Sequence, residues 1–493
     1  MEIAIKSFKT KHNKPDLHTL FYPKSIAIVG ASKNLIGGSK YYMALKSSGF
    51  FPIEGNVYLI NPKIEKLFGE SVYPSIKDDR IPKPIDLVII AVSATTVPKI
   101  LDECNKRAKF AVIYTSGFGE AGNEELDRQL KAIITQIDTR IIGPNGLGVL
   151  NPYSKLQIYP NWKEYKGNLS YIAQSGGTMA RLYLCLGPLG IGFHNVVSIG
   201  NAYDLSITEL ISYFHDDPIT KTIALYLESI PNGREFMKTA QKITPEKPII
   251  LWKGGQTNRG IRATASHTGG LAGSYDIWKA MCKQSGIMLA DHFELFQDLV
   301  QTIVVRPRLP EGLNVAILVA GGGIGVEFTD TFEKFGLIIP DFEPKTIQTL
   351  SSLFPSVNTN FKNPVDLGEW GYNPQLFEKA LKAVLEDSNI DVVVFVREPE
   401  RFGIISELLN IPDAQKATIE SLEKIAKDTQ KPLFCNPSMN KDDEKSYKQR
   451  HEFQIAMIKA GIPVINYMLN IPKIILQLWN YRNYLVKQKS IQV

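Results

Sequence analysis

The sequence contains few cysteines, and none of them form a closely spaced pair. In 493 residues there are four: Cys104, Cys185, Cys282 and Cys435. Zinc sites and redox motifs need two cysteines a few residues apart, so neither is expected here. The spacing predicts free, buried thiols in a reducing cytosol and no metal site.

Long hydrophobic runs are also absent. The longest, such as LVIIAV at 87–92, are too short to span a bilayer. The first residues, MEIAIKSFKTKHNKPDLH, carry charges throughout and have no apolar core, which argues against a signal peptide. We therefore expect a soluble cytoplasmic protein without a membrane segment.

A strong excess of one charge is missing as well. The net charge is +6 over the whole chain, and charged residues make up 22% of it. Because no basic patch is concentrated in the sequence, nucleic acid is not an expected partner, whereas an anionic ligand is compatible with this balance. The hydrophobic fraction of 44% is sufficient for the cores of about three domains.

One local pattern occurs three times. SIAIVGAS (25–32), NLSYIAQSGG (168–177) and NVAILVAGGGIG (314–325) are apolar runs that end in a turn of small residues. A stretch with helical apolar spacing follows each turn. A buried strand, a glycine turn and a helix form the opening unit of a doubly wound α/β domain, so three such domains are predicted.

Other apolar runs extend this prediction to whole sheets. Their continuous hydrophobicity is typical of parallel strands covered on both faces. They lie at 56–61, 86–92, 110–116, 222–228, 248–254 and 391–398. We expect three Rossmann- or flavodoxin-like domains with mainly parallel sheets, at 1–150, 151–306 and 307–493, with boundaries near 150–167 and 306–312.

The first glycine turn carries the signals for a ligand. Gly30 stands where backbone N–H groups and the helix dipole attract phosphate. An NAD site would have a second glycine at Ser32 and an acidic residue near Asn61, which makes an NAD-linked oxidoreductase a poor fit. Lys63 favours a ribose phosphate instead, as in coenzyme A. This turn alone fits a domain that binds no dinucleotide equally well.

Three further turns of small residues follow apolar strands of the first domain. In open α/β sheets ligands bind at these strand ends, and small residues allow a close backbone approach. The predicted CoA-binding residues are Gly30, Ala31, Ser32, Lys33, Asn61, Lys63, Val92, Ser93, Ala94, Thr115, Ser116, Gly117, Asn145 and Gly146.

Four motifs occur in an order that makes the interpretation specific. They are GPNGLGVLNP (143–152), YIAQSGG (171–177), LYLES (225–229) and SHTGGLAG (266–273). Over nearly its whole length the chain resembles the α subunit of acyl-CoA synthetases that form ADP or another nucleoside diphosphate, relatives of succinyl-CoA ligase. The resemblance implies that an acid, CoA and ATP are converted to acyl-CoA, ADP and phosphate, through an acyl phosphate and a phosphohistidine.

The resemblance assigns the phosphoryl carrier to His267. It lies in RATASHTGGLAG (262–273), where small side chains predict a mobile loop, and in the family this loop swings between distant sites. Neutral imidazole is a nucleophile near its ordinary pKa of about 6.5. Without the resemblance an ordinary loop histidine is the simpler interpretation. The other histidines are predicted to be structural or solvated: His12, His18, His194, His215, His292 and His451.

Two further assignments concern the second domain. Glu228 matches the family carboxylate that holds the phosphohistidine ring and fixes its tautomer, although a surface glutamate after a strand would look the same. Ser175, Gly176 and Gly177 match a helix N-terminus that receives phosphate, with Ser175 as the N-cap. A simple tight turn is compatible with the same three residues.

The third domain resembles the carboxy-terminal part of the partner subunit of succinyl-CoA ligase. Gly322 and Gly323, in AGGGIGVEFTD (320–330), would form a second phosphate-facing helix N-terminus, and NPVDLGE (363–369) also matches the family. Two positions depart from the pattern. Gly323 and Ile324 stand where relatives often have a proline, and Gly146 stands where they commonly have cysteine.

The machinery for ATP is missing from the sequence. An ATP-grasp domain needs roughly two hundred more residues, and no Gly-Lys-Ser/Thr loop is present. We therefore expect a separate ATP-grasp β subunit that binds ATP or ADP with Mg, in an α2β2 assembly. The expected activity is that of an acid–CoA ligase acting on a small carboxylic acid. The alternative is a non-catalytic CoA- or nucleotide-binding regulatory protein, which would have lost the phosphohistidine.

Overall fold

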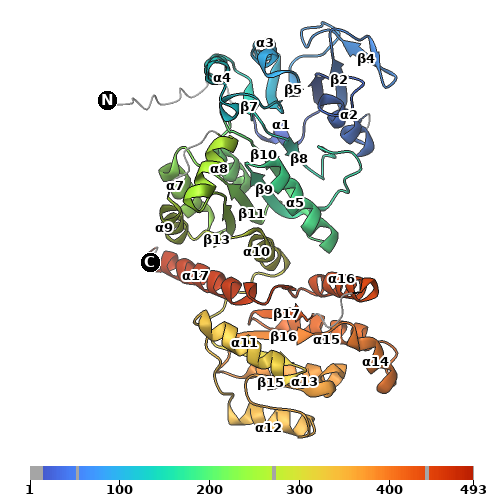
Figure 1. The fold of residues 1–493 in the computed structure, drawn as a ribbon, viewed down its shortest axis with the longest axis vertical. Helices are drawn as coiled ribbons and strands as arrows, with labels where there is room; N and C mark the ends of the chain where they lie inside the picture. Colours follow the sequence, from blue (N-terminus) through green and yellow to red (C-terminus); the bar gives the residue numbers. More distant parts are fainter. Residues whose placement is uncertain (1–14, 52–54, 269–273, 439–442, 492–493) are drawn as a thin grey trace. The chain divides into compact units, whose positions relative to one another are not determined.

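The computed structural model of the chain contains three separate β-sheets with helices packed on them (Figure 1). It describes residues 15–51, 55–268, 274–438 and 443–491, with the backbone alone at 265–268 and 491. The predicted α/β class with mainly parallel sheets is confirmed.

The first sheet has seven strands in the order β3-β4-β2-β1-β5-β6-β7. All its pairings are parallel except the short hairpin β3–β4. The strands are β1 (Ser25–Val29), β2 (Asn56–Ile60), β3 (Lys66–Leu67), β4 (Glu70–Tyr73), β5 (Ile85–Ile90), β6 (Ala108–Ile113) and β7 (Arg140–Ile142). The helices are α1 (His18–Phe21), α2 (Gly38–Ser47), α3 (Val97–Cys104) and α4 (Glu124–Gln136), with short 3-10 turns η2 (Ala94–Thr96) and η3 (Gly119–Ala121).

The second sheet has six strands in the order β13-β12-β11-β9-β10-β8. The strands are β8 (Gly148–Leu150), β9 (Lys166–Ala173), β10 (Phe193–Ser198), β11 (Thr222–Leu227), β12 (Ile249–Lys253) and β13 (Met288–Ala290). Strand β8 runs antiparallel to β10. It directly follows the turn 143–147, through which the chain passes from the first sheet to the second. The helices are α5 (Gly176–Leu186), α6 (Ile207–Asp216), α7 (Gly233–Ile243), α8 (Asn258–Thr268), α9 (Tyr275–Ser285) and α10 (Phe293–Val305), with η4 (Gly187–Leu189).

The third sheet is fully parallel, with the order β15-β14-β16-β17. Its strands are β14 (Val315–Val319), β15 (Val365–Asp366), β16 (Val392–Arg397) and β17 (Leu433–Pro437). The helices are α11 (Gly322–Lys334), α12 (Pro344–Leu353), α13 (Pro374–Glu386), α14 (Arg401–Leu408), α15 (Ala414–Asp428), α16 (Glu444–Lys459) and α17 (Asn470–Ile491), with η5 (Gly368–Tyr372). The three domain ranges drawn from the sequence stay a prediction.

The described chain divides into two compact units. One contains the first sheet and strands β8–β11, and the other contains β13, α10 and the third sheet. Within the second unit the C-terminal helix α17 packs against α10 and β13.

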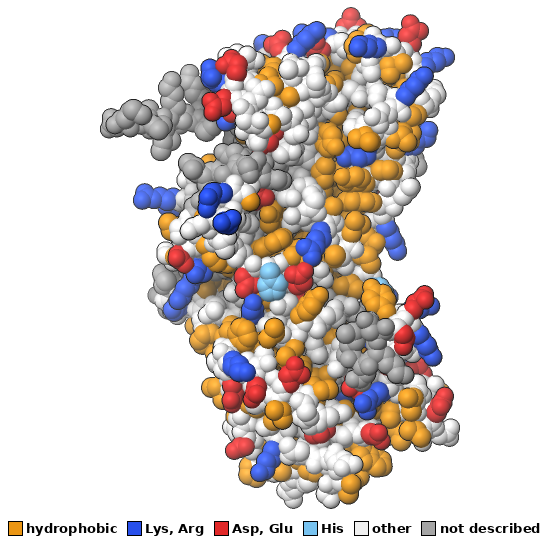
Figure 2. Space-filling model, viewed as in Figure 1, with side chains coloured by type: hydrophobic (Ala, Val, Ile, Leu, Met, Phe, Trp, Pro, Cys, Tyr) orange, Lys and Arg blue, Asp and Glu red, His pale blue; other side chains and the backbone are white. Residues whose placement is uncertain are grey.

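Several of the expected absences can be examined in the described residues. There, no helix combines the length and the apolar character needed to cross a membrane. All four cysteines are free thiols, three of them buried and Cys185 partly exposed. On the face shown in Figure 2, lysine and arginine are interspersed with aspartate and glutamate.

Candidate functional site

A cavity of about 470 Å³ lies where strands of the first and second sheets end. It is lined by the residues that follow β5 and β6, by the turn before β8, and by the start of α5. The lining residues are Ala91, Val92, Tyr114, Thr115, Ser116, Asn145, Gly146, Leu147, Gln174, Ser175, Gly176 and Gly177. Eight of these residues are predicted CoA or phosphate contacts: Val92, Thr115, Ser116, Asn145, Gly146, Ser175, Gly176 and Gly177.

Six further first-domain candidates lie in the turns after β1 and β2: Gly30, Ala31, Ser32, Lys33, Asn61 and Lys63. Gly30 has φ +97°, and a side chain there would place its Cβ 2.2 Å from the backbone oxygen of Ala91. The Asn61 amide donates to the backbone oxygen of Ala31 at 2.8 Å, so it ties the end of β2 to this turn. Lys33 and Lys63 are exposed. None of these residues is among the described lining of the cavity.

The turns after β5 and β6 are in contact through a hydrogen bond and close packing. Thr115 donates to the backbone oxygen of Val92 at 2.7 Å. Gly117 has φ +111°, and a Cβ there would lie 3.3 Å from that of Ala94. Ser93 Oγ and Thr96 Oγ1 share a hydrogen bond of 2.7 Å at the start of η2. The small residues therefore allow close packing between these two strand ends.

Gly146 occupies a position without space for a side chain. A Cβ there would lie 2.8 Å from the backbone oxygen of Ser198, at the end of β10. The backbone of the turn 143–147 thus lies directly against the second sheet. This close approach gives a physical reason for glycine at a position where cysteine is common in the family pattern.

The start of α5 is capped by a side chain and lies beside the cavity. Ser175 Oγ accepts a hydrogen bond from the N–H of Thr178 at 3.3 Å, so the predicted N-cap is present. Around Gly177 a Cβ would find only Ser175 Oγ, at 3.9 Å. Exposed N–H groups and the helix dipole at such an end favour an anion, and the cavity opens beside them.

Glu228 lies one residue beyond β11 and is only 4% exposed, so it is not a surface glutamate. Its carboxylate accepts from Tyr226 Oη at 3.1 Å. The N–H groups of Glu228 and Ser229 donate to Gln174 Oε1 at 2.5 and 3.0 Å. Because Gln174 also lines the cavity, this amide couples the Glu228 turn to the cavity wall.

Lys253 is a buried neighbour of Glu228 that sequence reasoning missed. It ends β12, is 0% exposed, and its ammonium lies 5.3 Å from the centroid of the Trp278 ring. Burial lowers the pKa of Lys253 to about 8, although the charge of Glu228 opposes this shift. The ammonium donates to the backbone oxygens of Gly254 and Gly255, in the turn that leads to α8.

The segment that carries His267 differs from the predicted mobile loop. Residues 262–268 belong to α8, so that prediction was wrong for this part. The physical reason is composition, because alanine is the best helix former and serine is tolerated. The side chain of His267 and residues 269–273 lie outside the described part of the structure. The role of His267 stays a prediction.

The glycines of the third sheet start a helix as predicted. Helix α11 begins at Gly322, and both Gly322 and Gly323 are exposed. A Cβ on Gly323 would meet nothing within 4 Å, whereas one on Gly322 would lie 3.3 Å from an Asp366 carboxylate oxygen. The NPVDLGE motif supplies this aspartate through β15.

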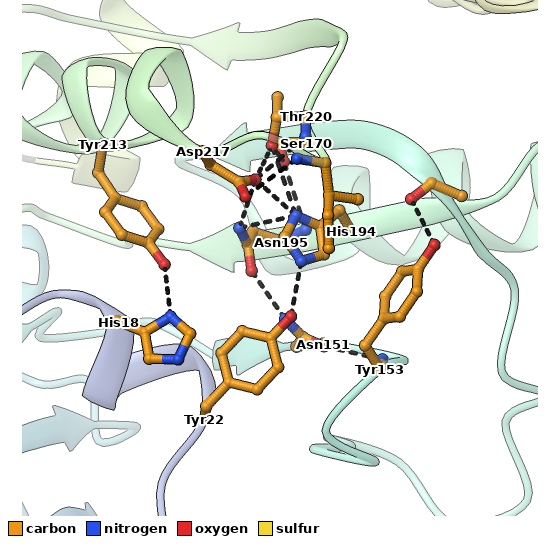
Figure 3. A network of polar contacts seen from close by, with 12 residues as sticks. His18, Tyr22, Asn151, Tyr153, Ser170, His194, Asn195, Tyr213, Asp217 and Thr220 are labelled. Atoms are coloured by element: carbon orange, nitrogen blue, oxygen red, sulfur yellow. Dashed lines mark hydrogen bonds and ion pairs between the residues drawn. The ribbon is translucent and has the colours of Figure 1, made fainter.

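A second polar cluster lies around His194 on β10 (Figure 3). His194 Nδ1 is 2.6 Å from an Asp217 carboxylate oxygen, and Nε2 is 2.8 Å from Tyr22 Oη. Burial raises the pKa of Asp217, but hydrogen bonds from His194 and Thr220 outweigh this and lower it to about 2. His194 is 1% exposed, which agrees with a structural role.

Two family models match the chain in this region. Residues 24–152 match a CoA binding domain, and residues 166–303 match a succinyl-CoA ligase like flavodoxin domain. Together with the cavity between a glycine-turn domain and a capped helix, these matches define a CoA-binding protein of the succinyl-CoA ligase type.

Similarity to individual relatives identifies the family within this class. The chain is 36% identical over 385 residues to the α subunit of ADP-forming acetate–CoA ligase II of Pyrococcus furiosus, covering 77% of this chain and 82% of the relative. It is 39% identical to an ADP-forming acetate–CoA ligase of Methanocaldococcus jannaschii, covering 71% of this chain. The chain therefore belongs to the ADP-forming acyl-CoA synthetase family, which confirms the resemblance seen in its motifs.

A solved structure gives the same result over almost the whole fold. The dinucleotide forming acetyl-coenzyme A synthetase 1 of Ca. Korarchaeum cryptofilum, in complex with phosphate and ADP, matches with a TM-score of 0.80 and 32% identity. The match covers 96% of this chain and 99% of the other. However, the chain spans only 49% of the Methanocaldococcus jannaschii relative and 55% of one from Archaeoglobus fulgidus, about half their length.

Proposed function

We propose that this chain is the α subunit of an ADP-forming acid–CoA ligase, which converts a small carboxylic acid, CoA and ATP reversibly to acyl-CoA, ADP and phosphate. The observation that supports this most is the cavity itself. Predicted CoA contacts after β5 and β6 and the predicted phosphate residues of α5 line one space. The thioester and the phosphate would have to meet in such a space.

The first domain has the features that CoA requires. Gly30 allows the turn after β1 to pack directly on Ala91, which brings the ends of β1 and β5 together at the edge where ligands of open α/β sheets bind. Lys33 and Lys63 are exposed cations near the ends of β1 and β2, suited to phosphate groups. When bound, CoA supplies the thiol that takes up the acyl group. The remaining predicted CoA contacts are proposed to flank its chain along the strand ends.

In the direction that consumes acyl-CoA, we assign each step of phosphoryl transfer to residues of this chain. The N–H groups at Ser175–Gly177 would hold phosphate as it attacks the acyl carbon, with the thiol as leaving group. A ring nitrogen of His267 would then take the phosphoryl group from the acyl phosphate and release the acid. Glu228 would accept a hydrogen bond from the other ring nitrogen and so fix the tautomer. Gly322 and Gly323 are proposed as a second phosphate-binding helix end.

The nucleotide step is proposed to occur on a partner. We infer an ATP-grasp β subunit that binds ATP or ADP with Mg, in an α2β2 assembly located in the cytoplasm. The similarity to a chain named as an α subunit supports this division. The longer relatives, of which this chain spans about half, are compatible with the same parts being fused.

The first test is phosphoryl labelling of the purified chain with acetyl-CoA and radiolabelled phosphate. We expect a label that is stable in base and labile in acid, as phosphohistidine is. His267→Ala should abolish it and Glu228→Gln should reduce it about tenfold or more, because the ring would lose its orienting partner. Labelling is measured by scintillation after base and acid treatment.

A control variant is His451→Ala, on α16, which should label like the wild type. Label that persists in His267→Ala would contradict the assigned carrier. A chain that binds CoA but never becomes labelled would favour the regulatory alternative.

A further inference from the structure

Gln174 is a lining residue of the cavity to which the proposed function assigns no role. It directly follows β9 and precedes Ser175, the N-cap of α5, and only 4% of its surface is exposed. Its backbone N–H donates to the backbone oxygen of Tyr226, on the neighbouring strand β11, at 3.1 Å. The sheet therefore holds an uncharged amide beside the start of α5.

The orientation of this amide is fixed by two backbone N–H groups. Those of Glu228 and Ser229 both donate to Gln174 Oε1, at 2.5 and 3.0 Å. An amide nitrogen is a donor and cannot accept these hydrogen bonds, so the oxygen has to face the turn after β11 and cannot exchange places with the nitrogen. Nε2 is consequently the end of the side chain that remains for a ligand.

Gln174 Nε2 has no acceptor in the part of the chain that the structure describes. No described residue accepts a hydrogen bond from it, and it is not one of the polar atoms there that the fold encloses without a partner. A buried amide that uses only its oxygen leaves both of its N–H donors unsatisfied, which is uncommon in folded proteins. Because Gln174 lines the cavity, a ligand in that cavity can accept from Nε2.

The start of α5 offers further donors in the same cavity. Ser175 Oγ accepts from the N–H of Thr178, whereas the N–H groups of Gly176 and Gly177 have no acceptor among the described residues. The described lining contains no lysine, arginine, aspartate or glutamate, so neutral donors have to hold an anion there. Phosphate has more acceptor sites than two backbone N–H groups can fill, and Gln174 supplies the next donor along the chain.

The order of the strands places the Gln174 amide toward Glu228. In the second sheet β9 lies between β11 and β10 (Figure 1). The predicted CoA contact Gly146 packs against the end of β10, and Glu228 follows β11 on the other side. The side chain of Gln174 extends from the end of β9 to the Glu228 turn. Its amide is therefore on the Glu228 side of the α5 start, opposite the CoA side.

We propose that Gln174 Nε2 donates a hydrogen bond to the phosphate bound at the start of α5, as a third donor beside the N–H groups of Gly176 and Gly177. The inference rests on the proposed function, which places phosphate at this helix end. Gln174 is then a catalytic residue, because its side chain contacts the reacting group. It holds phosphate during attack on the acyl carbon. It still contacts the phosphoryl group when the acyl oxygen leaves with the electron pair of the P–O bond and a ring nitrogen of His267 supplies the pair for the new P–N bond.

Nuclear magnetic resonance of the full chain, with isotopically labelled glutamine side-chain nitrogens, tests for this contact directly. The resonance that is missing from Gln174→Glu identifies Nε2 of this residue. In the wild type, saturated with CoA, we expect it to move downfield on addition of inorganic phosphate, because a hydrogen bond to an anion deshields the donated proton. The resonance of Gln301 on α10, whose Nε2 donates to the backbone oxygen of Val464 at 2.7 Å, should not move.

Two substitutions separate a contact with phosphate from support of the Glu228 turn. Gln174→Glu keeps an oxygen for the N–H groups of Glu228 and Ser229 but loses the donor, and Gln174→Met loses both. We expect both variants to bind phosphate about tenfold more weakly or worse in calorimetric titration, as expected for a hydrogen bond to a charged group, with CoA affinity unchanged. Phosphohistidine formation should slow by about a hundredfold. Gln301→Met removes a buried amide that is not in the described lining and should match the wild type.

The outcomes distinguish this inference from the proposed function. If phosphate binds to the wild type and no glutamine side-chain resonance moves, the inference is overturned whether or not any variant folds, and the proposed function stands. Wild-type phosphate affinity in Gln174→Glu also overturns it, because Gln174 then only supports the Glu228 turn. A wild-type chain that binds no phosphate and never becomes labelled contradicts the proposed function and this inference together.

Discussion

At the scale of single residues, the structural role of a buried polar side chain depends on hydrogen-bond partners that are distant in the sequence. His194 and Asn195 interrupt the apolar run of β10, and their partners Asp217, Tyr22 and Asn151 come from three other segments. β10 is therefore absent from the strands predicted by continuous hydrophobicity, although all its residues are buried. Glu228 could be found because it directly follows an uninterrupted strand.

The close packing around Gly146 predicts that any side chain at this position lowers the stability of the fold. Gly146→Ala should lower the free energy of unfolding by about 1–3 kcal/mol, because the new methyl group meets the backbone oxygen of Ser198 rather than a flexible side chain. Urea denaturation measures the change. Gly177→Ala is the matched control, with only one distant contact, and should cost nothing measurable or be slightly stabilising. Equal stability losses in the two variants would contradict this explanation.

At the scale of elements, the sequence gives strands more reliably than helix boundaries. Strands β5 and β16 are buried along their whole length, so their hydrophobic runs identify them directly. Helix α8 was missed at 262–268 because small residues are compatible with both a helix and a loop. The start of α5 was predicted correctly, because a serine followed by two glycines after a buried strand has few structural alternatives.

The helix-capping role of Ser175 can be tested separately from its proposed role in phosphate binding. Ser175→Ala should destabilise the chain by about 1 kcal/mol and also weaken phosphate binding, since Ser175 both caps the helix and lines the cavity. Ser206→Ala removes the capping box of α6, away from the cavity, and should cost similar stability without weakening phosphate binding. Denaturation and phosphate titration report the two effects. Equal phosphate affinity in both variants would remove Ser175 from the site.

At the scale of the whole molecule, the C-terminal helix provides a connection that no local pattern predicts. Helix α17 packs on α10, where Asn470 donates to Asp298 at 2.7 Å. Burial raises the pKa of Asp298 to about 7, and only the hydrogen bond from Asn470 opposes this. The three sheets follow from periodicity, but a contact between residues so far apart in sequence does not.

Asp298 should make stability depend on pH. Because its pKa is raised in the folded state, its contribution is fully present below about pH 4 and is lost as the pH rises through about 7. The loss amounts to up to about 4 kcal/mol. Asp298→Asn should therefore gain stability relative to the wild type between about pH 4 and pH 7, with no further gain above that, in urea denaturation.

Asp291 is the control of opposite sign. Burial acts to raise its pKa, but the hydrogen bonds from Lys473 of α17 and from His292 outweigh burial and lower it. Its contribution is thus present at neutral pH and lost in acid, so Asp291→Asn should be less stable than the wild type at pH 7 and approach it at low pH. A pH-independent difference for Asp298→Asn would contradict the assignment.

The turn 143–147 joins β7 of the first sheet to β8 of the second, and it also forms part of the cavity wall. The number of residues in this turn is therefore constrained by both sheets. An insertion there would push the wall outward and break the close packing of Gly146 on Ser198. Chimeras that exchange one sheet with a homologous protein while keeping the other should lose ligand affinity, so the two sheets have to be transplanted together.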